Sequence, residues 1–100
     1  MSDVSVSLHE NRSRYQAEVD DAVAGFAEYQ LAEGLIVFTH TEVDPAYEGR
    51  GVGSALARFA LDDVRAAGDR KVIATCPFIK AWIQKHPDYL SLLYDAPKSD

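Results

Sequence analysis

The hydrophobic pattern of this chain changes its period once, close to residue 50, and this change limits the folds available to it. Before that point, apolar and polar residues alternate as in half-buried β-strands, over residues 4–8, 14–19, 22–31 and 35–43. After it, Gly51 to Ala67 carries apolar residues at the spacing of an amphipathic helix. The first half of the chain therefore needs a sheet, and the second half needs helices.

The remaining segments complete a mixed order of strands and helices. Residues 71–75 form a short apolar strand, and a second amphipathic helix begins at Pro77 and ends before Pro87. Short turns between the first strands predict an antiparallel meander, whereas the strand–helix–strand step over residues 35–75 demands a parallel pair. We predict an α+β fold with a mixed sheet and the order β-β-β-β-α-β-α, in which residues 88–94 are either helical or extended.

Length and composition favour one globular domain. A chain of 100 residues with 47% hydrophobic residues is long enough for one core and too short for two. No apolar run reaches the roughly 18 residues of a membrane span. The start of the chain lacks the basic and apolar regions of a secretory signal, so we expect a cytoplasmic protein without membrane partners. A single cysteine excludes an internal disulfide.

The acidic balance of the chain indicates which partners suit it. Sixteen acidic against ten basic residues give a net charge of −6. Such a surface repels a phosphate backbone, so we expect no nucleic-acid partner. Amines and basic proteins or peptides are better suited to it, and we expect a monomer or a weak dimer.

The loop before the long helix is rich in glycine, and it is the most informative segment. Amides at the start of a helix have no partner inside the helix, and glycines let the backbone approach phosphate oxygens closely, so Gly49 to Ser54 resembles a phosphate cradle. A Walker loop would need a lysine here, and the dinucleotide fingerprint would need glycine where Leu56 or Ser54 stands. The alternative is a plain helix start whose glycines serve only the turn.

Several spaced motifs resemble the GNAT acetyltransferase superfamily. Glu48-Gly49-Arg50-Gly51-Val52-Gly53 matches both glycines of the family's acyl-CoA motif. Further motifs resemble the small single-domain branch called YjdJ-like: Thr39-His40-Thr41-Glu42-Val43, Tyr47-x-Gly49-Arg50-Gly51, Thr75-Cys76-Pro77-Phe78 and His86-Pro87-x-Tyr89. The resemblance covers residues 8–93, and it implies one N-acetyltransferase domain over residues 1–100.

The resemblance implies acetyl-CoA as cosubstrate, without a metal, in a cleft where the strands of residues 35–43 and 71–75 splay apart. The pyrophosphate would lie on the backbone amides of Gly49 to Ser54, and the pantetheine arm would pair with the backbone near Glu42 and Val43. Lys80 would steer the phosphates, unless it belongs to a solvated helix face. The expected cofactor-binding residues are Val43, Glu48, Gly49, Arg50, Gly51, Val52, Gly53, Ser54, Pro77 and Lys80.

Three features depart from the family pattern. Glu48 replaces a residue that usually carries an amide or a positive charge. Larger members have helices that wall the acceptor site where this chain has only His9-Glu10-Asn11, so we expect an open acceptor side. Ile83 stands where many members have a tyrosine that protonates the leaving thiolate. Cys76, water or Tyr89 would have to replace that acid.

Two side chains next to the glycine loop can take a proton from an amine. Because side chains in a strand alternate, Phe38, His40 and Glu42 are expected on one face. Histidine titrates near neutral pH, and burial can tune a glutamate, so either His40 or Glu42 can serve as general base. The alternative is that both are ordinary polar residues of an exposed sheet face.

Cys76 precedes the second helix, where a helix N-terminus lowers the pKa of a thiol. It would line the pocket at the thioester or carry the acetyl group covalently, and we favour lining. Together these residues predict an N-acetyltransferase that acts on an amine. The alternative is a CoA-binding module with weak or no catalysis, which the missing tyrosine and the missing acceptor wall favour.

Overall fold

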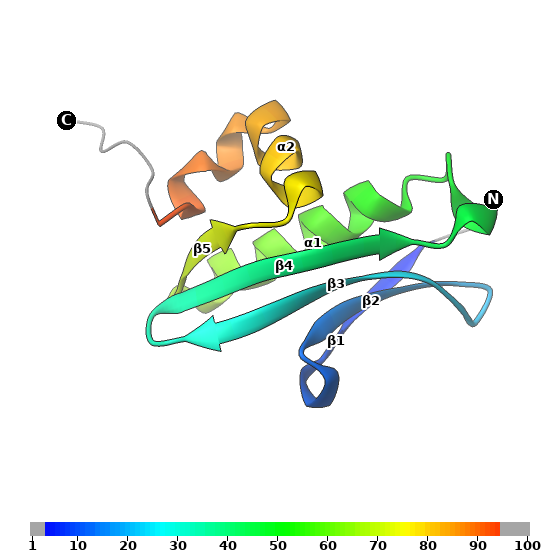
Figure 1. Cartoon of the computed structure of the whole chain (residues 1–100), viewed down its shortest axis with the longest axis horizontal. Helices are drawn as coiled ribbons and strands as arrows, with labels where there is room; N and C mark the ends of the chain where they lie inside the picture. The colour runs from blue at the N-terminus through cyan, green and yellow to red at the C-terminus, as the bar shows by residue number, and fades with distance from the viewer. Residues whose placement is uncertain (1–3, 95–100) are drawn as a thin grey trace.

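The computed structural model describes residues 4–94, which form one sheet and two α-helices (Figure 1). The elements in chain order are β1 (Ser5–His9), the 3-10 helix η1 (Glu10–Arg12), β2 (Arg14–Val19), β3 (Ala22–Ala32), β4 (Leu35–Val43), the 3-10 helix η2 (Pro45–Tyr47), α1 (Val52–Ala67), β5 (Lys71–Ala74), α2 (Pro77–Lys85) and the 3-10 helix η3 (Pro87–Leu92). The expected order is confirmed. The tail that the sequence left open is a 3-10 helix up to Leu92, and Leu93 then forms an isolated parallel bridge with Val72.

The sheet has the order β1-β2-β3-β4-β5, so every strand lies beside its neighbour in sequence. The first four strands pair antiparallel, and β4 pairs with β5 in parallel across the α1 crossover. The α+β mixed sheet expected from the change of period is therefore present. Within residues 4–94, neither α-helix has the length and apolar character that a bilayer crossing requires.

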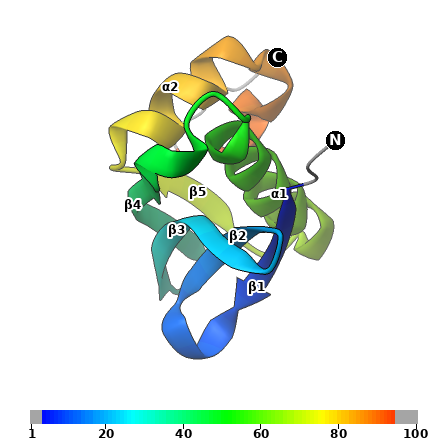
Figure 2. The same cartoon turned by 90° about the vertical axis from the view of Figure 1, so that its right-hand side faces the viewer.

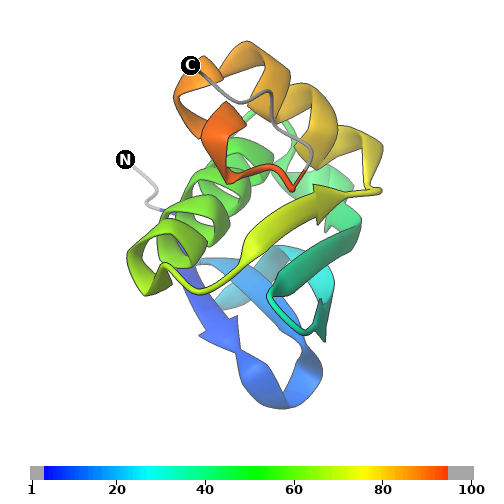
Figure 3. The same ribbon diagram turned by 90° about the vertical axis from the view of Figure 1, so that its left-hand side faces the viewer.

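The parallel pair of β4 and β5 is short, and the two strands separate where it ends; this separation is called the splay below. Pairing of β4 with β5 stops at Phe38 and Ala74, where the Phe38 carbonyl accepts the amides of Thr75 and Cys76 at 3.1 and 3.0 Å. The chain then turns into α2, as Figure 3 shows at the end of β5. Residues 39–43 of β4 continue without a β5 partner.

A β-bulge at Thr39 corrects one expectation from the sequence. Glu28 of β3 faces His40, but the next residue, Tyr29, faces Phe38, so Thr39 is an extra residue in β4. The bulge changes which side chains face the helices: Phe38 is fully buried, whereas His40 and Glu42 are exposed. The prediction that these three residues share one face is wrong, because strict alternation does not continue across a bulge.

One hydrophobic core joins the sheet to the helices. α1 packs along β1 to β4, and α2 lies next to it over the β4–β5 edge (Figure 2). The buried side chains of α1 are Val52, Leu56, Ala57, Ala60, Leu61 and Val64, and those of α2 are Ile79, Trp82 and Ile83. These contacts place the start of α1 close to α2 and close to the open end of the β4–β5 pair.

Candidate functional site

The glycine loop forms an open turn between β4 and α1. Gly49 and Gly51 have φ angles of 83° and 78°, a region that favours glycine, and a Cβ at either position would meet open space. Ala55 is the first amide bonded back into α1, through the Gly51 carbonyl at 2.9 Å. The amides of residues 52–54 precede this bond and have no acceptor within the helix. This geometry suits an anion at the start of α1.

Two residues of the predicted cradle also hold α1 against α2. A Cβ on Gly53 would lie 2.7 Å from the Phe78 ring, so only glycine allows this close approach. The Ser54 hydroxyl accepts the indole N–H of Trp82 at 2.9 Å. Helical spacing predicts Phe78 in the core, but its side chain is 41% exposed and lies on Gly53. The backbone amides at positions 53 and 54 remain available to a ligand, and so does the hydroxyl hydrogen of the exposed Ser54, since Ser54 Oγ only accepts from Trp82.

The other predicted cofactor residues lie in the loop, at the start of α1, at the end of β4 and on α2. Glu48 and Arg50 are exposed, with the Arg50 guanidinium carbon 5.8 Å from the centroid of the Tyr47 ring. Val52 offers its amide alone, because its side chain is 1% exposed. Val43 is half-buried against the core at the end of β4. On α2, Pro77 is the first residue and Lys80 is exposed.

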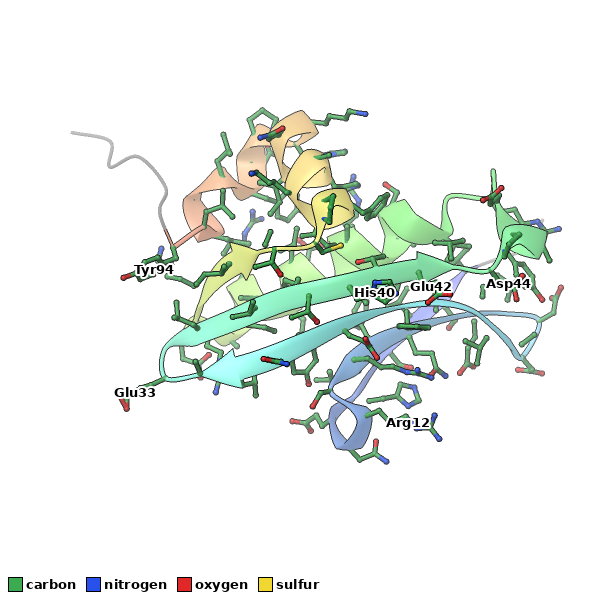
Figure 4. The ribbon with its side chains drawn as sticks, viewed as in Figure 1. Arg12, Glu33, His40, Glu42, Asp44 and Tyr94 are labelled. Carbon is green, nitrogen blue, oxygen red and sulfur yellow. The ribbon has the colours of Figure 1, made fainter. Side chains whose placement is uncertain are left out.

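His40 and Glu42 form a pair on the face of β4 that the bulge turns away from the core (Figure 4). His40 Nε2 lies 3.1 Å from Glu42 Oε2, and the two side chains are 54% and 62% exposed. A shallow cavity of about 190 Å³ borders Glu42 and is also lined by Phe26 and Asp44. Glu42 therefore has room beside it for a small polar group, whereas His40 does not line this cavity.

Cys76 occupies the opposite side of β4. Its side chain is 3% exposed, and the thiol donates to the Thr41 hydroxyl at 3.3 Å. Thr41 belongs to the stretch of β4 without a β5 partner, so the two residues face each other across the splay. Sequence reasoning missed Thr41, because strict alternation from Phe38 would place it on the outer face. The structure does not bring Cys76 onto the His40 side.

The tyrosines with shifted pKa values lie away from this site. Burial, followed by the hydrogen bond that its hydroxyl donates to Asp63 at 2.7 Å, raises the pKa of Tyr15 above its ordinary range. Tyr15 borders a cavity of about 230 Å³ near the other end of β4, which Ile36 also lines. Tyr89, a candidate acid, donates to Asp62 at 2.7 Å, and this bond raises its pKa. The Tyr89 hydroxyl is therefore held by a side chain of α1, away from the end of the β4–β5 pair.

Among residues 4–94, no group of three or more His, Cys, Asp and Glu side chains is placed to hold a metal ion.

Comparisons with known proteins point to one family. A family model described as GCN5-related N-acetyl-transferase matches residues 14–92. The protein NATD1 of Xenopus tropicalis is 31% identical over 88 residues, which cover 83% of this chain and 79% of that protein. Human NATD1 is 40% identical over 57 residues, which cover 57% of this chain and 50% of that protein. The chain spans about half the length of the human, mouse and chicken relatives it matches.

Solved structures share the fold at low sequence identity. A GCN5-like protein from Staphylococcus aureus superposes with a TM-score of 0.69 and 23% identity, covering 93% of this chain and 90% of that one. The ribosomal-protein-S18-alanine N-acetyltransferase of Escherichia coli gives a TM-score of 0.65 at 17% identity, covering 86% of this chain and 76% of that one. At such identities these likenesses establish the fold alone.

Proposed function

Because this chain belongs to the GCN5-related N-acetyltransferase family, we propose that it transfers an acetyl group from acetyl-CoA to an amine. The observation that carries the proposal is the joint placement of two features at one end of β4. The strand loses its β5 partner after Phe38, and the free amides of α1 begin just beyond the end of the same strand. A phosphate and an extended arm can therefore be bound together.

The binding of acetyl-CoA would use mainly backbone groups. The amides of residues 52–54, at the positive end of the α1 dipole, would bind the pyrophosphate. The unpaired edge of β4 over residues 39–43 offers N–H and C=O groups to the amides of the pantetheine arm, as an added strand would. Lys80 at the exposed face of α2 supplies positive charge for the phosphates.

The acceptor amine would approach from the outer face of the sheet. On the inner side of the splay Cys76 is buried and bonded to Thr41. On the outer side His40 and Glu42 are exposed, and no helix among the described residues covers them. His40 or Glu42 would take the proton that the amine loses, and positioning beside the thioester supplies the proximity advantage.

The class of acceptor follows from charge and access. Glu42 and Asp44 border the shallow cavity on the outer face, and the whole chain carries a net charge of −6. Where larger members have acceptor-wall helices, the described chain has only the single turn η1. We expect a cationic amine, on a basic protein or peptide or a small polyamine. Membership of the YjdJ-like branch and a cytoplasmic location belong to this proposal as well.

A CoA-binding module with weak or no catalysis is the second candidate. Ile83 is 1% exposed and carries no acid for the leaving thiolate. Tyr89 is bonded to Asp62, so Cys76 and water are the proton donors that remain.

One experiment separates the two candidates. The purified protein is titrated with acetyl-CoA by calorimetry and then incubated with acetyl-CoA and a lysine-rich peptide or spermidine, while free CoA thiol and acetylated amine are measured. Binding with turnover supports the transferase, and binding without turnover supports the module. A folded protein that does not bind acetyl-CoA would contradict both.

Cys76→Ala tests whether the thiol carries the acetyl group. We expect turnover within about threefold of the original chain, because a small buried side chain is lost but direct attack on the thioester remains possible. Intact-protein mass spectrometry after brief exposure to acetyl-CoA should show no acetyl adduct on the original chain. An adduct that disappears in Cys76→Ala, together with abolished turnover and retained CoA binding, would establish the covalent route instead.

A further inference from the structure

The outer face of the sheet carries an ordered side-chain network that leads to His40. Gln16 lies on this face and yet is only 6% exposed, and it is the one polar residue that is buried among residues 4–94. Its carbonyl oxygen accepts Arg14 Nη2 at 2.6 Å and Nε at 3.2 Å, and its amide donates to Glu18 at 2.8 Å. Arg14, Gln16 and Glu18 therefore form one hydrogen-bonded row along β2.

The network continues from β2 to β4 through one aromatic ring. The Arg14 guanidinium carbon lies 4.7 Å from the centroid of the Phe26 ring, a cation–π distance. The Phe26 ring centroid lies 6.0 Å from that of His40, with the two planes at 56°. Phe26 pairs with Gln16 on one side and with Glu42 on the other. The ring therefore bridges the Arg14–Gln16 pair and the His40–Glu42 pair.

We propose that Phe26, held by Arg14 and Gln16, is a positioning residue that fixes the orientation and the tautomer of His40. This inference rests on the proposed function for its catalytic consequence. The imidazole is held from one side by the Phe26 ring and from the other by the Glu42 carboxylate at 3.1 Å. A histidine on an exposed strand without such contacts would sample several rotamers.

The tautomer follows from hydrogen-bond chemistry. An ionised carboxylate only accepts hydrogen bonds, so Nε2 of neutral His40 carries the hydrogen that is shared with Glu42. Nδ1 then keeps its lone pair and is the nitrogen that can accept a proton from an amine. In this arrangement His40 accepts the proton, and Glu42 and Phe26 position the imidazole ring.

Nitrogen NMR of the imidazole tests the inference without any assay of activity. At a pH high enough that the His40 15N shifts no longer change with pH, the original chain should show one protonated Nε2 and one unprotonated Nδ1 for His40, with well-separated 15N shifts. In Phe26→Leu the two shifts should move toward each other, and Phe26→Tyr should restore the separation. Averaged shifts in the original chain, or unchanged shifts in Phe26→Leu, would overturn the inference.

Two further variants control the experiment. Phe59→Leu is the same change at an exposed aromatic of α1 that contacts Tyr15 and not His40, so it should leave the His40 shifts unchanged. Arg14→Met removes the cation from the Phe26 ring and should move the shifts in the same direction as Phe26→Leu. It keeps the test usable if Phe26→Leu does not fold, and unchanged shifts in folded Arg14→Met would contradict the role given to Arg14.

Kinetics then connect the inference to the reaction. If the chain transfers acetyl groups, Phe26→Leu should lower kcat about tenfold and leave KM for acetyl-CoA unchanged, because misplacement of a base slows the chemical step. In a His40→Ala background Phe26→Leu should have no further effect. An unchanged kcat in Phe26→Leu would remove the positioning role. Absence of all transfer with a fixed tautomer would contradict the proposed function and leave the tautomer result standing.

Discussion

His40→Ala should lower kcat for acetyl transfer by roughly 10²–10⁴-fold, because general base catalysis typically contributes that factor. The affinity for acetyl-CoA should not change, since His40 lies on the outer face of the sheet and the amides expected to bind the phosphates belong to α1. Fixed-time assays of released CoA thiol give kcat, and calorimetry gives the affinity for acetyl-CoA. His9→Ala is the matched control, because His9 belongs to β1 and its ring bonds the Ser7 hydroxyl.

Glu42→Gln tests what the Glu42 carboxylate contributes to the His40–Glu42 pair. A glutamine side chain at this position would keep the shape and an accepting oxygen but lose the charge, so we expect a smaller loss of kcat than in His40→Ala. The double variant should be no slower than His40→Ala alone, because groups that act as one unit are not additive. If both single variants and the double variant keep full activity, neither residue is the base.

Gly51→Asp should weaken acetyl-CoA binding by about 100-fold. The added carboxylate would stand at the start of α1, where the pyrophosphate is expected, and two like charges about 4 Å apart repel by several kcal/mol near a protein surface. The Gly51 φ angle of 78° also disfavours most side chains, so a matched control is needed. Calorimetric titration with acetyl-CoA measures the effect.

Gly51→Asn is that control, because asparagine has almost the shape of aspartate, tolerates positive φ and carries no charge. A Cβ at position 51 meets open space, and the two side chains have nearly the same shape, so any steric effect is common to both variants. We expect Gly51→Asn to bind acetyl-CoA within a few-fold of the original chain, with a similar melting temperature in both variants. Equal affinities in the two folded variants would show that no phosphate lies at this loop. Gly53 is unsuitable for this test, because any side chain there would strike Phe78.

Much of the fold could be predicted because its causes are local. Alternation of apolar residues in Tyr15 to Val19 and helical spacing in Gly51 to Ala67 are properties of short segments, and both elements are present. The glycine loop also lies between β4 and α1 as predicted. It could be predicted because Gly49 and Gly51 have positive φ, which few residues other than glycine adopt.

The candidate site could be predicted only in part, because the faces of β4 depend on its neighbours. The bulge at Thr39 arises where the register with β3 shifts between Glu28 and Tyr29, and nothing within β4 itself reveals it. That shift separates Phe38 from His40 and Glu42 and brings Thr41 to the inner face.

By itself, the sequence determined the order of strands and helices, the single change of period and the glycine turn that opens α1. Only the tertiary structure decided which side of β4 each polar residue takes, that Cys76 bonds Thr41, 35 positions away, and that Tyr89 is held by Asp62. The physical reason is the range of the interactions. Periodicity and turn preferences act over a few residues, whereas strand register and contacts across the core are set by partners that the chain brings together only on folding.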